Sequence, residues 1–216
     1  MAKIWDVYQQ IIWDWNGTIL DDVSVCLDII NDCLVRRQLS PLTLDRYLEI
    51  FDFPVIKYYQ RLGFDFERES FEAVGMEFIK AYQTRMFECP LHRQSLSTLN
   101  EIKNRGIPQF VLSALQVDNL HKVLQHFNLT GFFHEIRGVS DHYAWGKVEL
   151  GKALVRDHGK PHSKAVLLGD TTHDHETAKA IGIDCVLLAG GHNSYSRLKA
   201  CGVPVFHTLE ELHQAE

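Results

Sequence analysis

The stretch IIWDWNGTILDD, residues 11–22, joins a short apolar run to a polar turn. The run ends near Asp14, and Asn16, Gly17 and Thr18 follow directly. Short continuous apolar runs are typical of strands buried on both faces, as in parallel sheets. In open parallel sheets, ligand sites form at the carboxyl ends of the strands. The stretch therefore predicts a parallel α/β fold with a site close to Asp14.

Three further apolar runs support this prediction: QFVLSA (109–114), KAVLLGD (164–170) and DCVLLAGG (184–191). Weaker strand candidates are HEIRGV (134–139) and VPVFH (203–207). Helical patterns lie between them, and we expect one to open with a capping box from Thr98 to Glu101. We expect other helices to stop at Gly159, Gly182 and Gly202. Strands and helices in alternation predict a Rossmann-like α/β fold with right-handed crossovers.

Residues 20–89 interrupt this alternation. Apolar residues recur there at helical spacing, with one set over 23–34 and another over 71–86. Shorter helices are expected within 44–51 and 54–62, and no strand pattern appears. We therefore predict an all-helical cap domain at 20–89, inserted into a core domain made of 1–19 and 90–216.

Composition restricts the function. The chain has 216 residues, 45% of them hydrophobic, and a formal net charge of −6, which argues against a nucleic-acid partner. No stretch has the pattern of a signal peptide or a membrane span, so no membrane partner is expected. Five cysteines without metal-like spacing favour reduced thiols and a cytoplasmic protein. The oligomeric state is left open.

Four chemically useful side chains fall at or near the predicted strand ends. Asp14, Ser113 and Asp170 end three of the runs, and Lys147 precedes a predicted helix. One carboxylate can attack phosphorus while another helps to bind a hard divalent cation. The hydroxyl and nearby amides can bind phosphate oxygens, and the lysine offsets negative charge. This mixture predicts phosphoryl transfer.

With these motifs in order, the sequence resembles the haloacid dehalogenase-like superfamily, in its phosphoglycolate phosphatase-like branch with a helical cap. The first motif of that family, Asp-x-Asp-Gly-Thr, stands here as Asp14-Trp15-Asn16-Gly17-Thr18. The second and third correspond to Ser113 and Lys147. The fourth, Gly-Asp-x-x-x-Asp, corresponds to Gly169-Asp170 and Asp174. The resemblance covers essentially the whole chain.

The resemblance implies a role for each of these positions. Asp14 would attack the phosphoryl group and become an aspartyl phosphate. Mg²⁺ would be bound by Asp14, the backbone carbonyl of Asn16, and Asp170, with Asp174 acting directly or through water. The phosphate would be held by Lys147 and by Gly17, Thr18, Ser113 and Ala114. The implied activity is hydrolysis of a small phosphorylated metabolite, of the phosphoglycolate or sugar-phosphate type.

Asn16 departs from the family pattern, because the resembling phosphatases carry their general acid and base at this position. An amide cannot transfer a proton at neutral pH. Three interpretations stay open. Another group could replace the acid, with His173, His175, Asp21 and Asp22 as candidates. The leaving group could be good enough to need no acid. Alternatively, catalysis could be lost, which would leave a protein that binds a phosphorylated ligand or a protein partner.

The cap also carries aromatic residues such as Phe53, Tyr58 and Tyr59. We expect them to serve mainly in core packing rather than in contact with substrate. The insert of capped relatives closes over the site and selects the leaving group, but the sequence does not identify that group.

Overall fold

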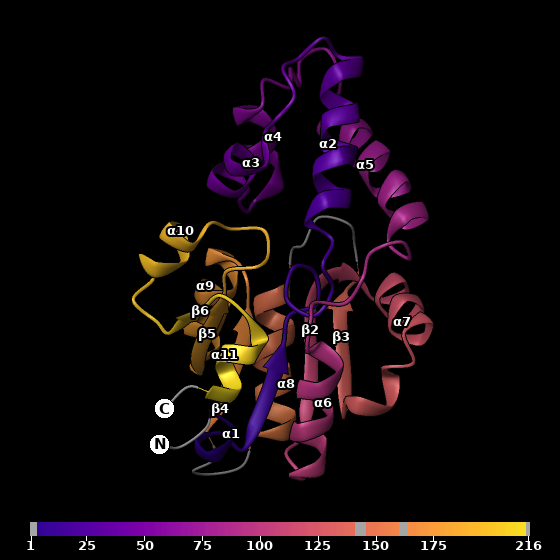
Figure 1. Cartoon of the computed structure of the whole chain (residues 1–216). Coiled ribbons are helices and arrows are strands. Elements are labelled where there is room, and N and C mark those ends of the chain that lie inside the picture. Colours follow the sequence, from indigo (N-terminus) through magenta and orange to yellow (C-terminus); the bar gives the residue numbers. More distant parts are fainter. Residues whose placement is uncertain (1–3, 141–145, 160–163, 215–216) are drawn as a thin grey trace.

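The protein is a parallel sheet flanked by helices, with a helical segment standing on one edge (Figure 1). The computed structural model describes residues 4–140, 146–159 and 164–214. Its six strands run in the order β3-β2-β1-β4-β5-β6, and every pairing is parallel. The strands are β1 (Gln10–Trp13), β2 (Gln109–Gln116), β3 (Glu135–Val139), β4 (Ala165–Gly169), β5 (Asp184–Leu188) and β6 (Val205–Phe206). The predicted fold class is confirmed, including the two weaker strands.

Helices cover both faces of the sheet because alternate strand residues point to opposite sides. Ile11 and Trp13 of β1 pack into one hydrophobic cluster, whereas Ile12 packs into the other. The first cluster includes residues of α1 (Ile4–Val7), α6 (Ser95–Asn104), α7 (Val117–His126) and α11 (Leu209–Gln214). The second includes residues of α8 (Lys147–His158), α9 (Thr172–Ile181) and α10 (Tyr195–Lys199). A short 3-10 helix, η1 (Thr130–Phe132), precedes β3.

One helix boundary differs from its prediction. The helix α6 begins at Ser95, so the expected capping box from Thr98 to Glu101 was wrong. Thr98 is fully buried within the helix, and the chain enters α6 through Gln94 in a left-handed conformation. The Thr-x-x-Glu pattern therefore lies one turn too late to act as a cap. Gly182, in contrast, ends α9 in a left-handed conformation, as expected.

Between β1 and β2 the chain forms four helices: α2 (Val23–Arg36), α3 (Leu44–Ile50), α4 (Val55–Arg61) and α5 (Phe71–Arg85). They stand above the carboxyl end of the sheet (Figure 1). The two connecting segments lie side by side, since Leu20 bridges to Leu91 and the Asp21 N–H donates to the Pro90 carbonyl over 2.8 Å. The helical segment is thus joined to the sheet at one place, next to the end of β1.

The helical segment also contacts the core at a second place, the loop before α10. The Ser194 N–H donates to the Leu48 carbonyl, and the Asn193 amide donates to the Phe51 carbonyl over 3.0 Å. The Arg197 guanidinium donates to the same Phe51 carbonyl over 2.5 Å. These contacts hold α3 over the sheet edge, so the space between helices and sheet is enclosed from two sides.

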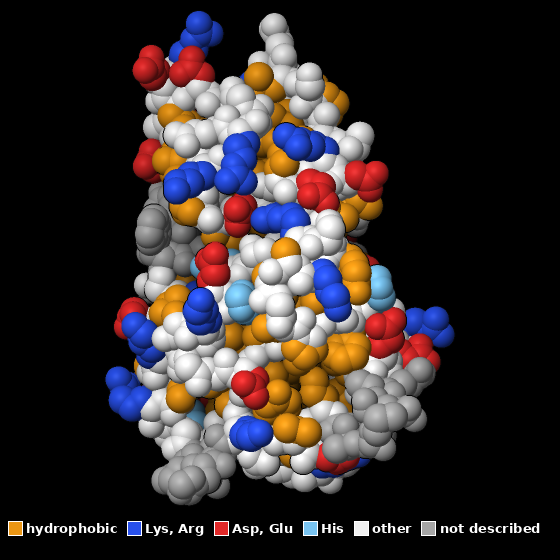
Figure 2. All heavy atoms as spheres, turned by 90° about the vertical axis from the view of Figure 1, so that its left-hand side faces the viewer, with side chains coloured by type: hydrophobic (Ala, Val, Ile, Leu, Met, Phe, Trp, Pro, Cys, Tyr) orange, Lys and Arg blue, Asp and Glu red, His pale blue; other side chains and the backbone are white. Residues whose placement is uncertain are grey.

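Charged side chains of both signs are present on the surface (Figure 2). On the face drawn in Figure 2, Lys and Arg side chains are interspersed with Asp and Glu rather than gathered in one basic patch. Within the described part of the chain, none of the helices is long and apolar enough to span a bilayer.

Candidate active site

The predicted site residues meet at the carboxyl ends of β1 and β4, which are neighbours in the sheet. Asp14 follows β1 and Asp170 follows β4, while Asp174 lies in the first turn of α9. Oxygens of these three buried carboxylates all lie within 4.8 Å of one another. The Lys147 ammonium, at the start of α8, lies 2.5 Å from oxygens of both Asp14 and Asp174. Residues from three distant parts of the chain therefore form one cluster.

This cluster carries more negative than positive charge. Burial, together with the charges of Asp174 and Asp170, raises the pKa of Asp14 although Lys147 opposes the shift. Burial likewise raises the pKa of Asp170 to about 6. Burial disfavours the Lys147 ammonium, but Asp14 and Asp174 outweigh it and raise the pKa of Lys147. Three carboxylates against one ammonium leave an excess that a divalent cation would balance, and hard oxygen ligands suit Mg²⁺. The residues present therefore fit this cation.

Asp174 is already saturated with hydrogen bonds. Its Oδ2 accepts from the N–H groups of Asp170 and Thr171 and from the Thr171 hydroxyl, which completes a capping box at the start of α9. Its Oδ1 contacts Lys147. Asp174 thus fixes both the loop after β4 and the lysine, which leaves it suited to reach a cation through water.

Asp170 is held in a space that two glycines leave open. A Cβ atom on Gly17 would lie 2.2 Å from the Asp170 Oδ2, and one on Gly191 would lie 2.1 Å from the same oxygen. The Thr18 hydroxyl donates to the Asp170 Oδ1 over 2.8 Å. The Gly17 N–H already donates to Leu20 and to Asp22, and neither Gly17 nor Thr18 lines the pocket. These two residues support Asp170, and their expected contact with phosphate stays a prediction.

Ser113 and Ala114 lie toward the end of β2 and line the same pocket as Asp14 and Lys147. The Ser113 hydroxyl oxygen accepts a hydrogen bond from the Leu115 N–H over 3.0 Å. Its own proton thus stays available for donation to an anionic oxygen.

The Asn16 amide is fixed by two partners. It donates to the Asp22 Oδ2 over 2.7 Å and to the Tyr82 hydroxyl, and that hydroxyl in turn donates to the same Asp22 oxygen. Tyr82 belongs to α5, so this network joins the loop after β1 to the helical segment. With both of its donor hydrogens in use, the amide has a structural place but no proton to exchange.

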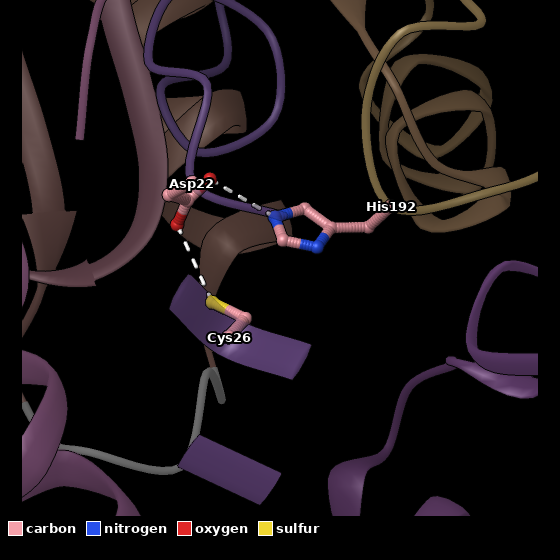
Figure 3. Close-up of side chains that lie close together, drawn as sticks. All are labelled: Asp22, Cys26 and His192. Carbon is pink, nitrogen blue, oxygen red and sulfur yellow. Dashed lines mark hydrogen bonds and ion pairs between the residues drawn. The ribbon is translucent and has the colours of Figure 1, made fainter. Parts of the chain in front are cut away.

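Asp22, the partner of Asn16, also forms a buried ion pair with His192 (Figure 3). The His192 Nε2 lies 3.2 Å from the Asp22 Oδ1, and its Nδ1 lies 2.8 Å from the Tyr47 hydroxyl. Burial opposes both charges, yet each partner outweighs it: His192 lowers the pKa of Asp22 to about 2, and Asp22 raises the pKa of His192 to about 9. The Cys26 thiol donates to Asp22, and the backbone N–H of His192 donates to the Asp170 Oδ2. The pair thus links the helical segment to Asp170.

The four suggested replacements for the missing acid differ in position. Asp22 and His173 line the pocket, whereas Asp21 and His175 do not. Asp22 is held ionised by His192, so it carries no proton to give. The His173 ring packs on Phe53 with centroids 4.5 Å apart, and burial lowers its pKa. Neither of the two candidates that line the pocket, Asp22 and His173, is therefore a ready proton donor at neutral pH.

Sequence reasoning missed His192, Tyr47 and Tyr82. A signal for His192 was present, because it follows the glycines at the carboxyl end of β5, where sites form. No sequence signal pointed to Tyr47 or Tyr82. Helical spacing predicts that such a side chain is buried, but not which residue of the core domain its hydroxyl contacts.

The pocket is a cavity of about 210 Å³ between the sheet edge and the helical segment. A cavity of about 150 Å³ can hold benzene, so this one has room for a small organic molecule. Aromatic rings line its far side, among them Phe51, Phe53, Tyr58, Tyr59, Phe71 and Phe78. Phe53, Tyr58 and Tyr59, expected mainly to pack in the core, also face this space.

Comparison with known proteins gives a consistent family. The family model described as haloacid dehalogenase-like hydrolase matches residues 11–188. A phosphoglycolate phosphatase of Rhodobacter capsulatus is 24% identical over 188 residues, 84% of each chain. A tyrosine-protein kinase of Mycobacterium tuberculosis is 30% identical over 122 residues, which are 54% of this chain and 42% of that one. The solved structure of a haloacid dehalogenase-like family protein from Streptococcus pneumoniae has a TM-score of 0.80 at 19% identity, and the match covers 97% of this chain and 99% of that one.

Proposed function

Because the chain belongs to the haloacid dehalogenase-like hydrolases, we propose that it is a Mg²⁺-dependent phosphatase of a small phosphomonoester. The observation that carries this proposal is the cluster of Asp14, Asp170 and Asp174, of which Asp14 and Asp174 contact Lys147 and line a cavity with room for a small molecule. The names of two curated relatives make phosphoglycolate the first substrate to assay.

In the proposed reaction, Asp14 attacks phosphorus and becomes an aspartyl phosphate. Of the two Asp14 carboxylate oxygens, Lys147 contacts Oδ1, so Oδ2 is the oxygen available for attack. Ser113 and the backbone at Ala114 bind phosphate oxygens, and Lys147 offsets their charge. Mg²⁺ would be held by Asp14, Asp170 and the Asn16 carbonyl, where it supplies charge neutralisation at the phosphoryl oxygens. Asp174 keeps Lys147 and the loop after β4 in place.

Asn16 limits this mechanism at both proton transfers. It cannot protonate the leaving oxygen, and it cannot activate the water that releases phosphate from Asp14. General acid–base catalysis contributes about 10²–10⁴-fold, so a poor leaving group loses about that factor here. Attack on phosphorus and phosphate binding need no proton from Asn16 and are expected to persist.

We assign residues 20–89 to a cap domain that encloses the leaving group, with residues 1–19 and 90–216 as the core domain. The enclosed cavity between α2–α5 and the sheet edge supports this assignment. The cysteines are free thiols, four of them buried, which suits the reducing cytoplasm as the proposed location.

Phosphate release tests the proposal. Wild type, Asp14→Asn and the surface control Asp32→Asn are incubated with Mg²⁺ and a panel of phosphomonoesters. We expect turnover in wild type and in the control and none in Asp14→Asn. Equal rates in wild type and Asp14→Asn would contradict the proposal.

The alternative is a protein that binds a phosphorylated ligand or a protein partner without turnover. It predicts release in none of the three proteins, together with retained binding of fluoroberyllate, a phosphate mimic, in the presence of Mg²⁺. Turnover that appears only after Asn16→Asp would also favour this alternative.

A further inference from the structure

The positively charged side chains around the cavity already have partners within the protein. Among the described residues that line it, Lys147 is the only Lys or Arg, and it contacts Asp14 and Asp174. The His192 imidazole lies 3.2 Å from the Asp22 carboxylate. The described lining therefore has no free cation for a carboxylate on the leaving group, and a buried unpaired carboxylate is costly.

The wall that faces the leaving group is neutral and aromatic. Phe51, Tyr58 and Phe78 belong to three parts of the cap and line the same cavity. Burial raises the pKa of Tyr58, so its hydroxyl stays protonated. Flat apolar walls of this kind favour another ring, since aromatic pairs gain about 0.5–1.5 kcal/mol beyond the burial of their area.

An aromatic leaving group, a phenolate, would not need the proton that Asn16 cannot give. A phenol has a pKa near 10, like the side chain of tyrosine. An aliphatic alcohol is about as weak an acid as water, whose pKa is about 15.7. A phenolate therefore departs readily without general acid help, whereas an alkoxide does not.

We propose that the substrate of this site is an aryl phosphate whose ring carries no charged group. The ring lies among the cap aromatics, and the aryl oxide leaves unprotonated. This inference rests on the proposed phosphatase function. Asp14 forms a bond to phosphorus as the P–O(aryl) bond breaks, and the electron pair leaves on the aryl oxide, which takes a proton from water. Water then attacks the aspartyl phosphate, the P–O(Asp14) bond breaks, and the water's proton passes to solvent. No oxidant or further co-reactant is required.

The leaving group is tested with two esters of similar size and polarity, phenyl phosphate and cyclohexyl phosphate. We expect kcat/KM to be at least about 10²-fold higher for phenyl phosphate, the lower limit of what a general acid supplies. Because the second step also lacks a base, we expect a burst of about one phenol per enzyme before the slow steady state. Asn16→Asp should raise the rate with cyclohexyl phosphate far more than the rate with phenyl phosphate.

The preference of the aromatic wall for a ring is tested separately from catalysis, by measuring inhibition with phosphonates that cannot be hydrolysed. Phenylphosphonate should inhibit at least tenfold more strongly than phosphonoacetate, which carries a carboxylate instead of a ring. Gln83→Arg places a cation in the lining and should improve phosphonoacetate inhibition. Gln60→Arg, on exposed α4 surface outside the lining, should leave it unchanged.

The outcomes separate the two proposals. Turnover of phosphoglycolate or cyclohexyl phosphate within tenfold of phenyl phosphate would overturn the aryl substrate and leave the phosphatase intact. Stronger inhibition by phosphonoacetate than by phenylphosphonate would do the same. An absence of phosphate release from every ester, without a burst, would overturn the phosphatase itself.

Discussion

Replacement of Gly17 by alanine tests whether the glycine is kept for its conformation or for the space it leaves to Asp170. Gly17 has φ +72°, and non-glycine residues in this region cost about 1–2 kcal/mol. The added Cβ would also lie 2.2 Å from the Asp170 Oδ2. That oxygen cannot easily move away, because Asp170 is fully buried and bonded to Thr18 and His192. Overpacking adds about 1–3 kcal/mol, so the total is about 2–5 kcal/mol.

Gly182 offers a matched control for the conformational part. It has φ +77°, and no described atom lies within 4 Å of its virtual Cβ. Gly182→Ala should therefore cost only about 1–2 kcal/mol. For a chain of this size 1 kcal/mol corresponds to about 2–4 °C in Tm, so the control should lose about 2–8 °C and Gly17→Ala about 4–20 °C.

Thermal unfolding with and without MgCl₂ and fluoroberyllate gives both readouts. We expect Gly17→Ala to lose most of the stabilisation by these ligands, because Asp170 is displaced, whereas Gly182→Ala keeps it. Equal Tm values for the two variants, with ligand stabilisation retained in both, would refute the argument that the missing Cβ makes room for Asp170.

Three further predictions follow from the contacts. Lys147→Met leaves the buried Asp14 and Asp174 without their cation, which should lower stability by about 3–5 kcal/mol in metal-free buffer, and MgCl₂ should restore part of the Tm; an unchanged metal-free Tm would contradict the pairing. MgCl₂ should stabilise wild type, by about 2.7 kcal/mol at a concentration of 100 Kd, but not Asp170→Asn, and titration of the Tm measures both. Partial burial raises the pKa of Glu77, but the ion pair with Arg37 outweighs burial, so this pKa lies below the ordinary 4.5. The ion pair therefore stabilises the cap above pH 4.5, and this stabilisation is lost as the pH falls below that value. The Tm deficit of Glu77→Gln should be present at pH 7 and disappear in acid below pH 4.5.

The sheet and its site were predictable because their signals are local. A continuous apolar run predicts a buried strand wherever it occurs, and the residue after it then falls at the sheet edge. This reasoning located Asp14 and Asp170, which occupy neighbouring strands. The α6 boundary was missed for a physical reason, since Thr98 and Glu101 match a cap pattern that the longer helix overrides.

The contacts between cap and core were not predictable in this way. Tyr82 and Asn16 are 66 residues apart, and His192 and Asp22 are 170 apart. No periodicity in one segment tells which hydroxyl or imidazole of another will reach it. The neutral wall of the cavity depends on the same docking, because Phe51 and Phe78 line one cavity only once the cap is placed over the sheet.

These unpredicted contacts explain why an amide at position 16 stabilises the structure. Its amide donates to Asp22, which also accepts from Tyr82 and is paired with His192. An aspartate at position 16 would place a second carboxylate 2.7 Å from Asp22, a distance at which two like charges repel by roughly 6 kcal/mol at an effective dielectric of about 20. The amide removes this repulsion and adds a hydrogen bond to α5. In place of the acid that the family pattern carries there, position 16 holds an amide whose contacts join residues 20–89 to the loop after β1. Under the proposed function, this costs little turnover only when the leaving group departs without a proton.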